Sequence, residues 1–442
     1  MPVSVRFPRL AAGVVLAGLL AAPAARAQGT EPMILPPQGL ASPAQNSAPP
    51  GPAAPIEPAR PAVAATKPPA PSAEAKISQD PQPTLLPDSA SLIVAAARRY
   101  AEIAARGGWP TVPEGPLTKP GQSAAHIPAV RSRLAAEGED GGDIASPVLD
   151  APLAAAVKRF QWRHGLPETG IVGPATVKAM NIPAEARERA LLYSADRLTG
   201  LDFAFGARHV VVNIPSAAVE TVEDGAVARR YVAVAGDPRH PSPTVTARIG
   251  AINLNPTWTL PISIVKNEII PKMRKDPGTL AKQRIRIFGA SGQEIDPTRI
   301  DWSTNAAVNY TLRQDSGPGN ALGQLRIAMP NRHDVYMHDT PSKRHFASDR
   351  RFLSHGCVRV SGVLDLAMWI LAPQGFTRAT LEAALASAER KDIGLPKPVP
   401  VAWVYLTGWV TTDGATHFRE DVYGLDRPDP LDELVTATIA ER

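Results

Sequence analysis

The chain has 442 residues, enough for two or three domains of ordinary size and for a large buried core. Its 47 Lys and Arg against 42 Asp and Glu give a formal net charge of +5. The excess is spread along the chain, so nucleic acid is not an expected partner. A mildly basic surface instead suits an anionic polymer.

The N-terminus has the features of a secretory signal peptide. Arg6 and Arg9 precede an apolar run from Leu10 to Ala22, which is shorter than the roughly 20 residues that a membrane span needs. The triplet Ala25-Arg26-Ala27 fits cleavage before Gln28. We therefore expect residues 1–27 to be a signal peptide and the mature protein to act outside the cytoplasm. A retained N-terminal anchor is the alternative.

Residues 28–88 are rich in Pro and Ala. The stretch from Glu31 to Asp88 holds sixteen of the chain's 47 prolines and no aromatic residue, so it lacks the side chains that build a core. This composition predicts a disordered, partly extended linker.

Residues 89–187 are expected to be helical. A helical pattern begins at Ser89 and stops at Gly107-Gly108, and a polar, Gly-rich gap follows. Pro174 is then expected to open a further helix that ends near Met180. Between the gap and this helix, apolar residues recur at helical spacing, which predicts one apolar face; they are Leu153, Ala156, Val157 and Phe160.

In residues 188–425 the residue pattern changes from helical to strand-like after a last helical stretch. β-branched residues alternate with polar ones, and Asp224-Gly225 is a strong hairpin signal. Short strands are expected to about Val360, followed by helices from Val363 to Ile370 and from Arg378 to Glu389. The segment VPVAWVYLTGWV predicts a late buried strand, and residues 426–442 form a tail.

The chain has one cysteine, Cys357, so no intramolecular disulfide can form. An unpaired thiol in an exported protein needs a reason, which is either burial as an inert residue or reactivity. Cys357 ends the sequence Ser354-His355-Gly356-Cys357, and His338 lies nineteen residues upstream. An imidazole can lower the pKa of a neighbouring thiol, and a glycine before the nucleophile permits a sharp turn. Such a turn aims the amides of Gly356 and Cys357 at a developing oxyanion.

Two segments resemble known families. LDAPLAAAVKRFQWRHGLPETGIVGPATVKAMNIP resembles the small three-helix peptidoglycan-binding domain, which we place at about residues 145–183. VYMHDTPSKRHFASDRRFLSHGCVRVSG resembles the catalytic motif of the YkuD-type L,D-transpeptidases, an upstream His followed by [ST]-H-G-C-x-R. NPTWTLPISIVKNEIIPKMRKDP, IDWS and GPGNALGQLRIAMPN resemble the large proteobacterial branch of that family. The resemblance covers about Ser89 to Tyr423.

The resemblance implies an α+β fold, in which a small all-α peptidoglycan-binding domain precedes a mostly-β catalytic domain at 188–425. A capping segment at about 262–302 is also implied. It makes Cys357 the nucleophile and His338 the general base of a periplasmic enzyme of cell-wall biogenesis and cell shape. Peptidoglycan stem peptides would be donor and acceptor, carbapenems would be inhibitors, and neither metal nor cofactor is required. A monomer is expected.

The reaction that the resemblance implies is a 3-3 cross-link between diaminopimelate residues, made through a thioester. Two alternatives remain open. Water could resolve the same thioester, which would make the enzyme an L,D-carboxypeptidase that trims tetrapeptide stems. The donor could also be a different L-centre of the stem.

Period-two geometry assigns roles to the neighbouring residues. If Val335 to His338 is a strand, Tyr336 and His338 face the same side, so Tyr336 either contacts substrate or packs on the sheet. Arg359 shares a face with Cys357 and is a candidate to hold a stem carboxylate.

The residue that follows His338 points to the opposite face in a strand, so Asp339 is a doubtful triad member. A backbone carbonyl or Ser354 is a better candidate to orient the base. His355 is expected to hydrogen-bond at the turn more than to transfer protons.

Three other classes of protein compete with this interpretation. A zinc hydrolase is suggested by the proximity in sequence of His333, His338, His345 and His355 to Cys357, but none has HExxH or CxxC spacing. In papain-like proteases the Cys precedes the His, whereas here it follows. A wall-binding protein with a spent catalytic domain is disfavoured by the intact His and Cys.

Overall fold

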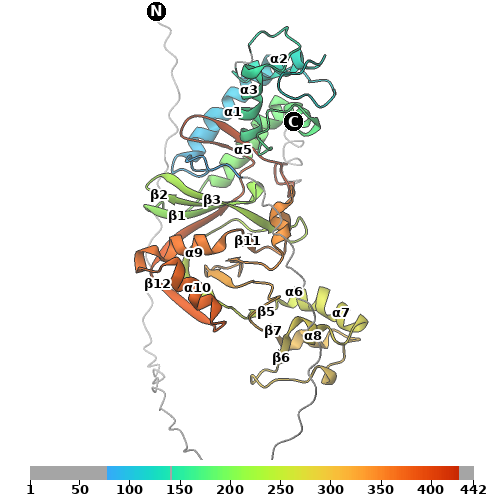
Figure 1. Cartoon of the computed structure of the whole chain (residues 1–442), viewed down its shortest axis with the longest axis vertical. Helices are drawn as coiled ribbons and strands as arrows, with labels where there is room; N and C mark the ends of the chain where they lie inside the picture. Colours follow the sequence, from blue (N-terminus) through green and yellow to red (C-terminus); the bar gives the residue numbers. More distant parts are fainter. Residues whose placement is uncertain (1–76, 140–141, 428–442) are drawn as a thin grey trace, which may run out of the picture. The chain divides into compact units, whose positions relative to one another are not determined.

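The computed structural model of the protein describes residues 77–139 and 142–427 (Figure 1). The predicted signal peptide, residues 28–76 of the predicted linker and residues 428–442 of the predicted tail lie outside this range. Among the residues described, no helix combines the length and apolarity that crossing a membrane requires.

In the described part of the chain five α-helices precede the sheet, and all but α2 lie in stretches that the sequence predicts to be helical. The apolar face expected on α3 forms: its four predicted residues are fully buried in one cluster with residues of α2 and α4. Asp150 caps α3 by accepting a hydrogen bond from the amide of Leu153 at 3.0 Å. The helices are α1 Ser89–Ala105, α2 Ile127–Ala135, α3 Ala151–Arg163, α4 Pro174–Met180 and α5 Ala184–Leu198.

Helix α2 lies in the stretch that the sequence suggested was a gap between helices. Ile127, Val130 and Leu134 have no exposed surface, so their i, i+3 and i+7 spacing supplies one wall of the cluster. Pro128 at the helix start and the Gly-rich flanks hide this short pattern in the sequence. The predicted limits of about 145–183 for the helical domain therefore omit its first helix.

A nine-stranded sheet forms the second layer, in the order β10-β3-β11-β9-β8-β4-β12-β1-β2. β2 also pairs with β3, so the sheet closes on itself. Its strands are β1 Arg208–Asn213, β2 Ala218–Glu223, β3 Ala226–Gly236, β4 Val245–Leu254, β8 Leu325–Ala328, β9 Met337–His338, β10 Phe352–Ser354, β11 Val358–Val360 and β12 Lys391–Val404. A separate hairpin pairs β13 Gly408–Val410 with β14 Thr416–Phe418.

The two faces of this sheet pack against different helices. On one face, α9 Val363–Leu371 and α10 Arg378–Ala386 bury their apolar residues against side chains of β4, β8, β9 and β11. On the other face, α1 and α5 cover β1, β2 and the end of β12. The second face is therefore covered by helices only in part, and β8, β9 and β11 lie beyond that cover. Short 3₁₀ turns complete this layer at η1 Ile214–Ser216, η5 Lys343–Ala347 and η6 Ala372–Gln374.

The predicted hairpin at Asp224-Gly225 is confirmed. Glu223 pairs with Ala226, and Asp224 and Gly225 have φ angles of 49° and 82°. Two residues at positive φ make the tight turn whose twist matches that of the strands, which explains the Asp-Gly pair. The predicted strand from Val335 to His338 is shorter than expected, because only Met337 and His338 are in regular pairing.

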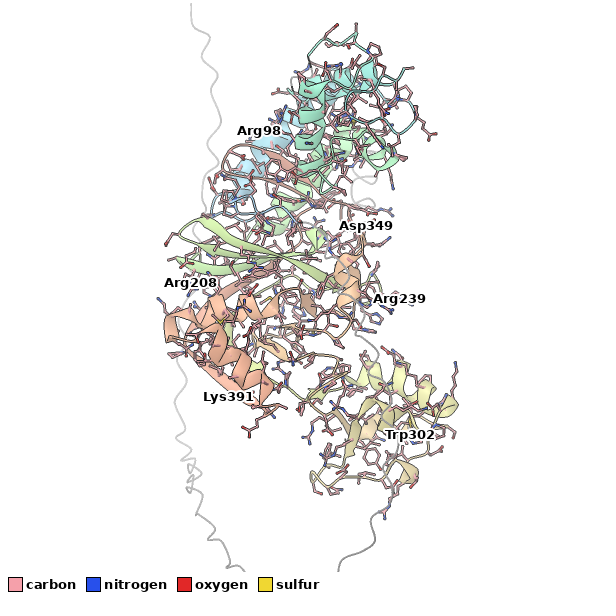
Figure 2. All side chains as sticks on the ribbon, viewed as in Figure 1. Arg98, Arg208, Arg239, Trp302, Asp349 and Lys391 are labelled. Atoms are coloured by element: carbon pink, nitrogen blue, oxygen red, sulfur yellow. The ribbon has the colours of Figure 1, made fainter. Side chains whose placement is uncertain are left out.

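A small body with its own core is inserted between β4 and β8, and we call it the cap. Its sheet has the order β5-β7-β6 and packs on short helices, and Trp302 lies within it (Figure 2). The core runs from Trp258 to Leu312 and so extends beyond the predicted 262–302. The elements are β5 Trp258–Thr259, α6 Ile262–Ile264, the π-helix η2 Val265–Ile269, α7 Ile270–Lys275, α8 Thr279–Gln283, β6 Ile285–Phe288, η3 Pro297–Arg299, η4 Ala306–Asn309 and β7 Thr311–Gln314.

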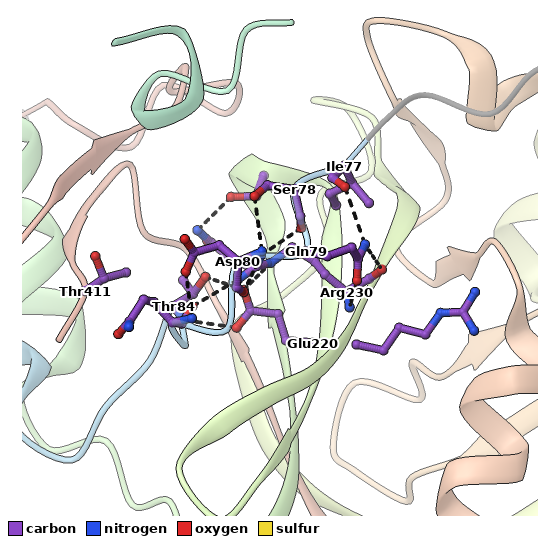
Figure 3. Close-up of polar contacts among 12 residues, drawn as sticks. Ile77, Ser78, Gln79, Asp80, Thr84, Glu220, Arg230 and Thr411 are labelled. Atoms are coloured by element: carbon purple, nitrogen blue, oxygen red, sulfur yellow. Dashed lines mark hydrogen bonds and ion pairs between the residues drawn. The ribbon is translucent and has the colours of Figure 1, made fainter. Parts of the chain in front are cut away.

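The end of the predicted linker, residues 77–88, is not a free spacer but docks on the β2–β3 hairpin (Figure 3). Arg230 donates to the carbonyl oxygens of Ser78, Asp80 and Gln82 at 2.8, 3.1 and 3.0 Å. Its Nε also pairs at 2.8 Å with the carboxylate of Glu220. We call residues 77–88 the strap. Composition missed it because the strap has no apolar core of its own and its partners, among them Arg230 and Glu220, are distant in sequence.

The buried carboxylate of Glu220 holds the strap in place through hydrogen bonds that detachment would break. Its carboxylate accepts from the amide and hydroxyl of Thr84 at 3.0 and 2.6 Å, and only 2% of the residue is exposed. Trp162 of α3 donates from its indole to Ser78 at 3.1 Å, so the strap contacts the helical domain as well as the sheet. A buried carboxylate with one cationic partner depends strongly on that partner.

We predict that Arg230→Ala lowers the free energy of unfolding of the full-length protein by roughly 3 kcal/mol, because it leaves the Glu220 carboxylate buried without its cation. Urea unfolding followed by tryptophan fluorescence measures the change. Arg229→Ala is the matched control: its guanidinium is half exposed and pairs with Asp365, so the expected loss is at most about 1 kcal/mol. Equal losses in the two variants would refute the assigned role of the strap contact.

Candidate active site

Cys357 lies at the end of a tight turn between β10 and β11. Gly356 has a φ of 104°, a conformation that residues with a side chain rarely adopt. Ser354 closes the turn: its hydroxyl donates to the carbonyl of Cys357 at 2.5 Å and accepts from the amide of Gly356 at 3.2 Å. The motif residues Ser354 and Gly356 therefore act first on the backbone, where they fix the position of Cys357.

A second loop braces this turn and was not predicted. The hydroxyl of Ser242 donates to the carbonyl of Gly356 at 2.7 Å and accepts from the amide of Gly236 at 2.9 Å. Tyr423 bonds both residues in turn, by accepting from the Ser242 amide at 3.1 Å and donating to the Gly236 carbonyl at 2.8 Å. These residues come from distant parts of the chain and belong to no local motif, so nothing in the sequence marks them.

The pairing of three strands gathers the candidate side chains on one face. β11 runs parallel to β9 with Arg359 opposite His338, and β9 runs antiparallel to β8 with Arg326 opposite His338. Continuing the first register by one residue sets Cys357 beside Tyr336, whose carbonyl accepts from the amide of Val358 at 3.1 Å. Since side chains alternate along strands, these five residues share one face of the sheet. The predicted shared faces of Tyr336 with His338, and of Arg359 with Cys357, follow from this register.

His338 is held by its backbone neighbour. Its Nδ1 lies 2.5 Å from the carbonyl oxygen of Asp339, so Nδ1 carries the proton and Nε2 is left as the acceptor. The carboxylate of Asp339 points elsewhere, toward Lys343 and the amide of Gln324. The doubt about Asp339 as a triad member is thus justified by the structure, and the orienting group is a backbone carbonyl.

Both catalytic candidates are neutral at rest. Burial raises the pKa of the Cys357 thiol to about 11, against the lowering effect of hydrogen bonds from Tyr336 and of the Arg326 and Arg359 charges. Burial also lowers the pKa of His338 to about 4, and the positive charge of Arg359 acts in the same direction. The lowered thiol pKa that the sequence suggested is therefore not found, because burial penalises the thiolate and the imidazolium alike.

The register places His338 one step diagonally from Cys357. In the described chain the thiol makes no hydrogen bond with the imidazole, and the hydrogen bonds that act on its pKa are those with Tyr336. The Tyr336 and His338 rings are 5.7 Å apart, with their planes at 65°. Diagonal neighbours on a sheet are about 7–8 Å apart at Cα, which is within reach of long or aromatic side chains. Cys357 and His338 therefore lie on either side of one point on this face of the sheet, above β9 and β11.

Two arginines border this position. Arg359 donates from Nη1 to Nδ1 of His345 at 3.1 Å, and Arg326 lies with its guanidinium carbon 4.7 Å from the centre of the Tyr336 ring. The Nε atoms of both are buried without a hydrogen-bond partner within the described residues. Arg359 was predicted as a substrate contact. Arg326 was not, because its place beside the site depends on the pairing of β8 with β9, which local sequence does not show.

His355 connects the turn to the cap. Its Nε2 lies 3.1 Å from the carboxylate of Glu268, in the π-helix of the cap. The rings of His355 and His240 are 4.6 Å apart. Burial lowers the pKa of His355, although the carboxylate of Glu268 opposes this change. These contacts fit the structural role that the sequence favoured for this residue.

The amide of Gly356 already donates to Ser354, so of the two predicted oxyanion donors only the amide of Cys357 is without a hydrogen bond in the described chain. The histidines near the motif do not gather around an ion either. Within residues 77–139 and 142–427, no three His, Cys, Asp or Glu side chains converge in an arrangement that could hold a metal.

Two segments of the chain match known family models. Residues 207–397 match the family model for the L,D-transpeptidase catalytic domain, and residues 124–180 match the one described as "Putative peptidoglycan binding domain". The chain is 31% identical over 226 residues to a Haemophilus influenzae protein named "Putative L,D-transpeptidase". That alignment covers 51% of this chain and 46% of the relative, so it spans about half the length of that protein.

Similar solved structures include two L,D-transpeptidases. The enzyme from Mycobacterium smegmatis is 16% identical, with a TM-score of 0.22 and coverage of 44% of this chain and 58% of that one. The catalytic domain from E. faecium, acylated by ertapenem, is 12% identical, with a TM-score of 0.20 and coverage of 36% and 85%.

We predict that iodoacetamide alkylates Cys357 at a rate that rises about tenfold per pH unit from pH 7 to 10 without a plateau, because the thiolate fraction grows in this way below a pKa of about 11. Intact mass follows the reaction, since the chain has no other thiol. His338→Gln should leave the profile unchanged, because a neutral imidazole does not hold the thiolate. A pH-independent rate between pH 6 and 8 that disappears in His338→Gln would contradict the neutral pair.

Proposed function

Because residues 207–397 belong to the L,D-transpeptidase catalytic-domain family and follow a peptidoglycan binding domain, we propose that the protein cross-links peptidoglycan stem peptides through a thioester on Cys357. The product is a 3-3 link between diaminopimelate residues. The observation that carries this proposal is the position of the chain's one thiol on a turn fixed by Ser354, on the same face as a neutral imidazole whose Nε2 is free to accept a proton.

The first half of the reaction forms the thioester. The Cys357 sulfur attacks the carbonyl at the L-centre of diaminopimelate in stem position three while its proton passes to Nε2 of His338. Since pKa values of about 11 and about 4 make the separated ions costly, this transfer accompanies attack and does not precede it. The C–N bond to D-Ala then breaks, and the imidazolium returns the proton to the leaving amine.

The second half consumes the thioester. The neutral side-chain amine of a second stem attacks the thioester carbonyl and gives a proton to Nε2 of His338. The C–S bond breaks, and the imidazolium protonates the departing sulfur, which restores the resting thiol. Through both halves the carbonyl of Asp339 keeps the proton on Nδ1, so the same nitrogen alternates between base and acid. The amide of Cys357 is placed to donate to the oxyanion.

The competing activity is hydrolysis of the same thioester, which would give an L,D-carboxypeptidase. Two contacts of the cap favour transfer to an amine. Glu268 bonds His355 beside Cys357, and the indole of Trp258 lies close enough to Tyr336 to act on the pKa of its hydroxyl. Side chains gathered over the site restrict water and position an acceptor, and both conditions are needed because water is present at roughly 55 M.

We also propose that the protein works in the periplasm as a monomer, after export through residues 1–27. The basic N-terminus, the short apolar run and the A-x-A triplet support this location. The same thioester chemistry makes carbapenems candidate inhibitors that would acylate Cys357. A donor at a different L-centre of the stem remains the second candidate for the cross-link type.

We predict that purified protein converts disaccharide tetrapeptide into dimers as a major product, and that fragmentation of the dimers by tandem mass spectrometry shows a diaminopimelate–diaminopimelate bond. Cys357→Ala should lower turnover at least about a thousandfold while its unfolding midpoint stays unchanged, because no second thiol can form the intermediate. Tripeptide alone, across a range of acceptor concentrations, would replace transpeptidation with carboxypeptidase activity. Full activity in Cys357→Ala would end both proposals.

A further inference from the structure

A row of polar side chains crosses the sheet on the face that carries Cys357. Pairing sets Asp392 of β12 opposite Asn253 of β4, Asn253 opposite Arg326, Arg326 opposite His338, and His338 opposite Arg359. We call these five residues the polar row. The residues on both sides of Asn253, Arg326 and Arg359 belong to the main core, as do Ile393 beside Asp392 and Met337 beside His338, so the row lies on the opposite face.

The next row toward Cys357 is made of small residues. Gly394, Ala251 and Ala328 are register partners of one another, and the same register leads from Ala328 to Tyr336 and then to Cys357. All three are partly or fully exposed. Residues this small leave room for another chain to lie close to the sheet. The polar row would then run alongside that chain.

The charges of the polar row are uneven. At one end, Asp392 is neutralised by Arg390 at 2.9 Å and accepts from Asn253 at 2.7 Å. At the other end, Arg326 and Arg359 form no ion pair within the described chain, and the Nε atom of each is buried without a hydrogen bond. A buried guanidinium Nε–H that lacks an acceptor is costly, and the cost disappears when a carboxylate accepts from it.

Both cations lie close to the reacting groups. Each lowers the pKa of Cys357, and each also lowers the pKa of His338, so both charges are felt at the position where a scissile carbonyl would sit. Their strands are separated by β9 alone, so the two backbones lie about 9–10 Å apart. Two long side chains at this spacing can converge on one carboxylate above His338.

We propose that Arg326 and Arg359 form a carboxylate-binding subsite that makes the enzyme select donors with a free carboxylate next to the scissile bond, and that Arg326 is a specificity-determining residue. This rests on the proposed function. Two groups of the stem have the required chemistry, namely the terminal carboxylate of the leaving D-Ala and the side-chain carboxylate of diaminopimelate. The subsite binds the donor and takes no part in bond making, so its loss alters the choice between donors.

The test compares matched donors: disaccharide tetrapeptide with all carboxylates free, the same compound amidated at D-Ala, and the same compound amidated at the diaminopimelate side chain. We expect the wild-type enzyme to show kcat/KM at least about tenfold lower for one amidated donor, as for the loss of a charge-assisted hydrogen bond. The amidated donor whose kcat/KM is lower identifies the carboxylate that the two arginines bind. Arg326→Gln should reduce the ratio between free and amidated donors to within about threefold.

Two variants separate recognition from structure. Arg326→Lys keeps the charge but not the two-pronged geometry, so it should retain an intermediate ratio. Arg248→Gln removes an exposed cation elsewhere on β4 and should leave the ratio unchanged. Because Arg326 also contacts the Tyr336 ring and acts on the pKa of Cys357, the ratio between donors is diagnostic and the absolute rate is not.

A second readout works without turnover. The rate at which a carbapenem acylates Cys357, compared with that of its carboxyl ester, should favour the acid at least about tenfold in wild type and lose this preference in Arg326→Gln. Equal rates for every amidated donor and for acid and ester in the wild-type protein would overturn the subsite. So would an Arg326→Gln variant that keeps the wild-type ratios. Acid-selective acylation without dimer or tripeptide formation would reject the proposed function while supporting the subsite.

Discussion

The parallel pairing of β9 with β11 is the constraint on which the site depends. It sets Arg359 opposite His338 and Cys357 opposite Tyr336, and the antiparallel neighbour β8 adds Arg326 to the same face. A slip of one residue would turn every one of these side chains into the core. The register is fixed in turn by Met337, Val358 and Val360, which are fully buried on the other side of the sheet.

Burial then decides the chemistry of the pair. The environment disfavours both the thiolate and the imidazolium, so the resting enzyme holds a neutral thiol and a neutral imidazole. Such a thiol is protected from oxidation and alkylation until a carbonyl is in place to receive it. The charges of Arg326 and Arg359 partly offset the penalty for negative charge on the Cys357 sulfur.

Sequence reasoning succeeded where the signal is local. The apolar spacing of α3 and the Asp224-Gly225 turn are each contained within a few residues. The two-part α+β architecture, a helical peptidoglycan binding domain before a mostly-β catalytic domain, is confirmed. Sequence reasoning failed where the signal comes from residues that are distant in sequence. Arg326 depends on strand pairing, and the strap depends on Arg230 of a hairpin about 150 residues away.

The proposed reaction requires that Cys357 carries the donor stem as a thioester. Intact-mass spectrometry of the protein quenched in acid shortly after mixing with disaccharide tetrapeptide, followed by peptide mapping, tests this most directly. The account predicts one adduct with the mass of the donor less D-Ala, located on Cys357 and released by an added amine acceptor. Turnover with no adduct on Cys357, or with the donor attached to another residue, would contradict it.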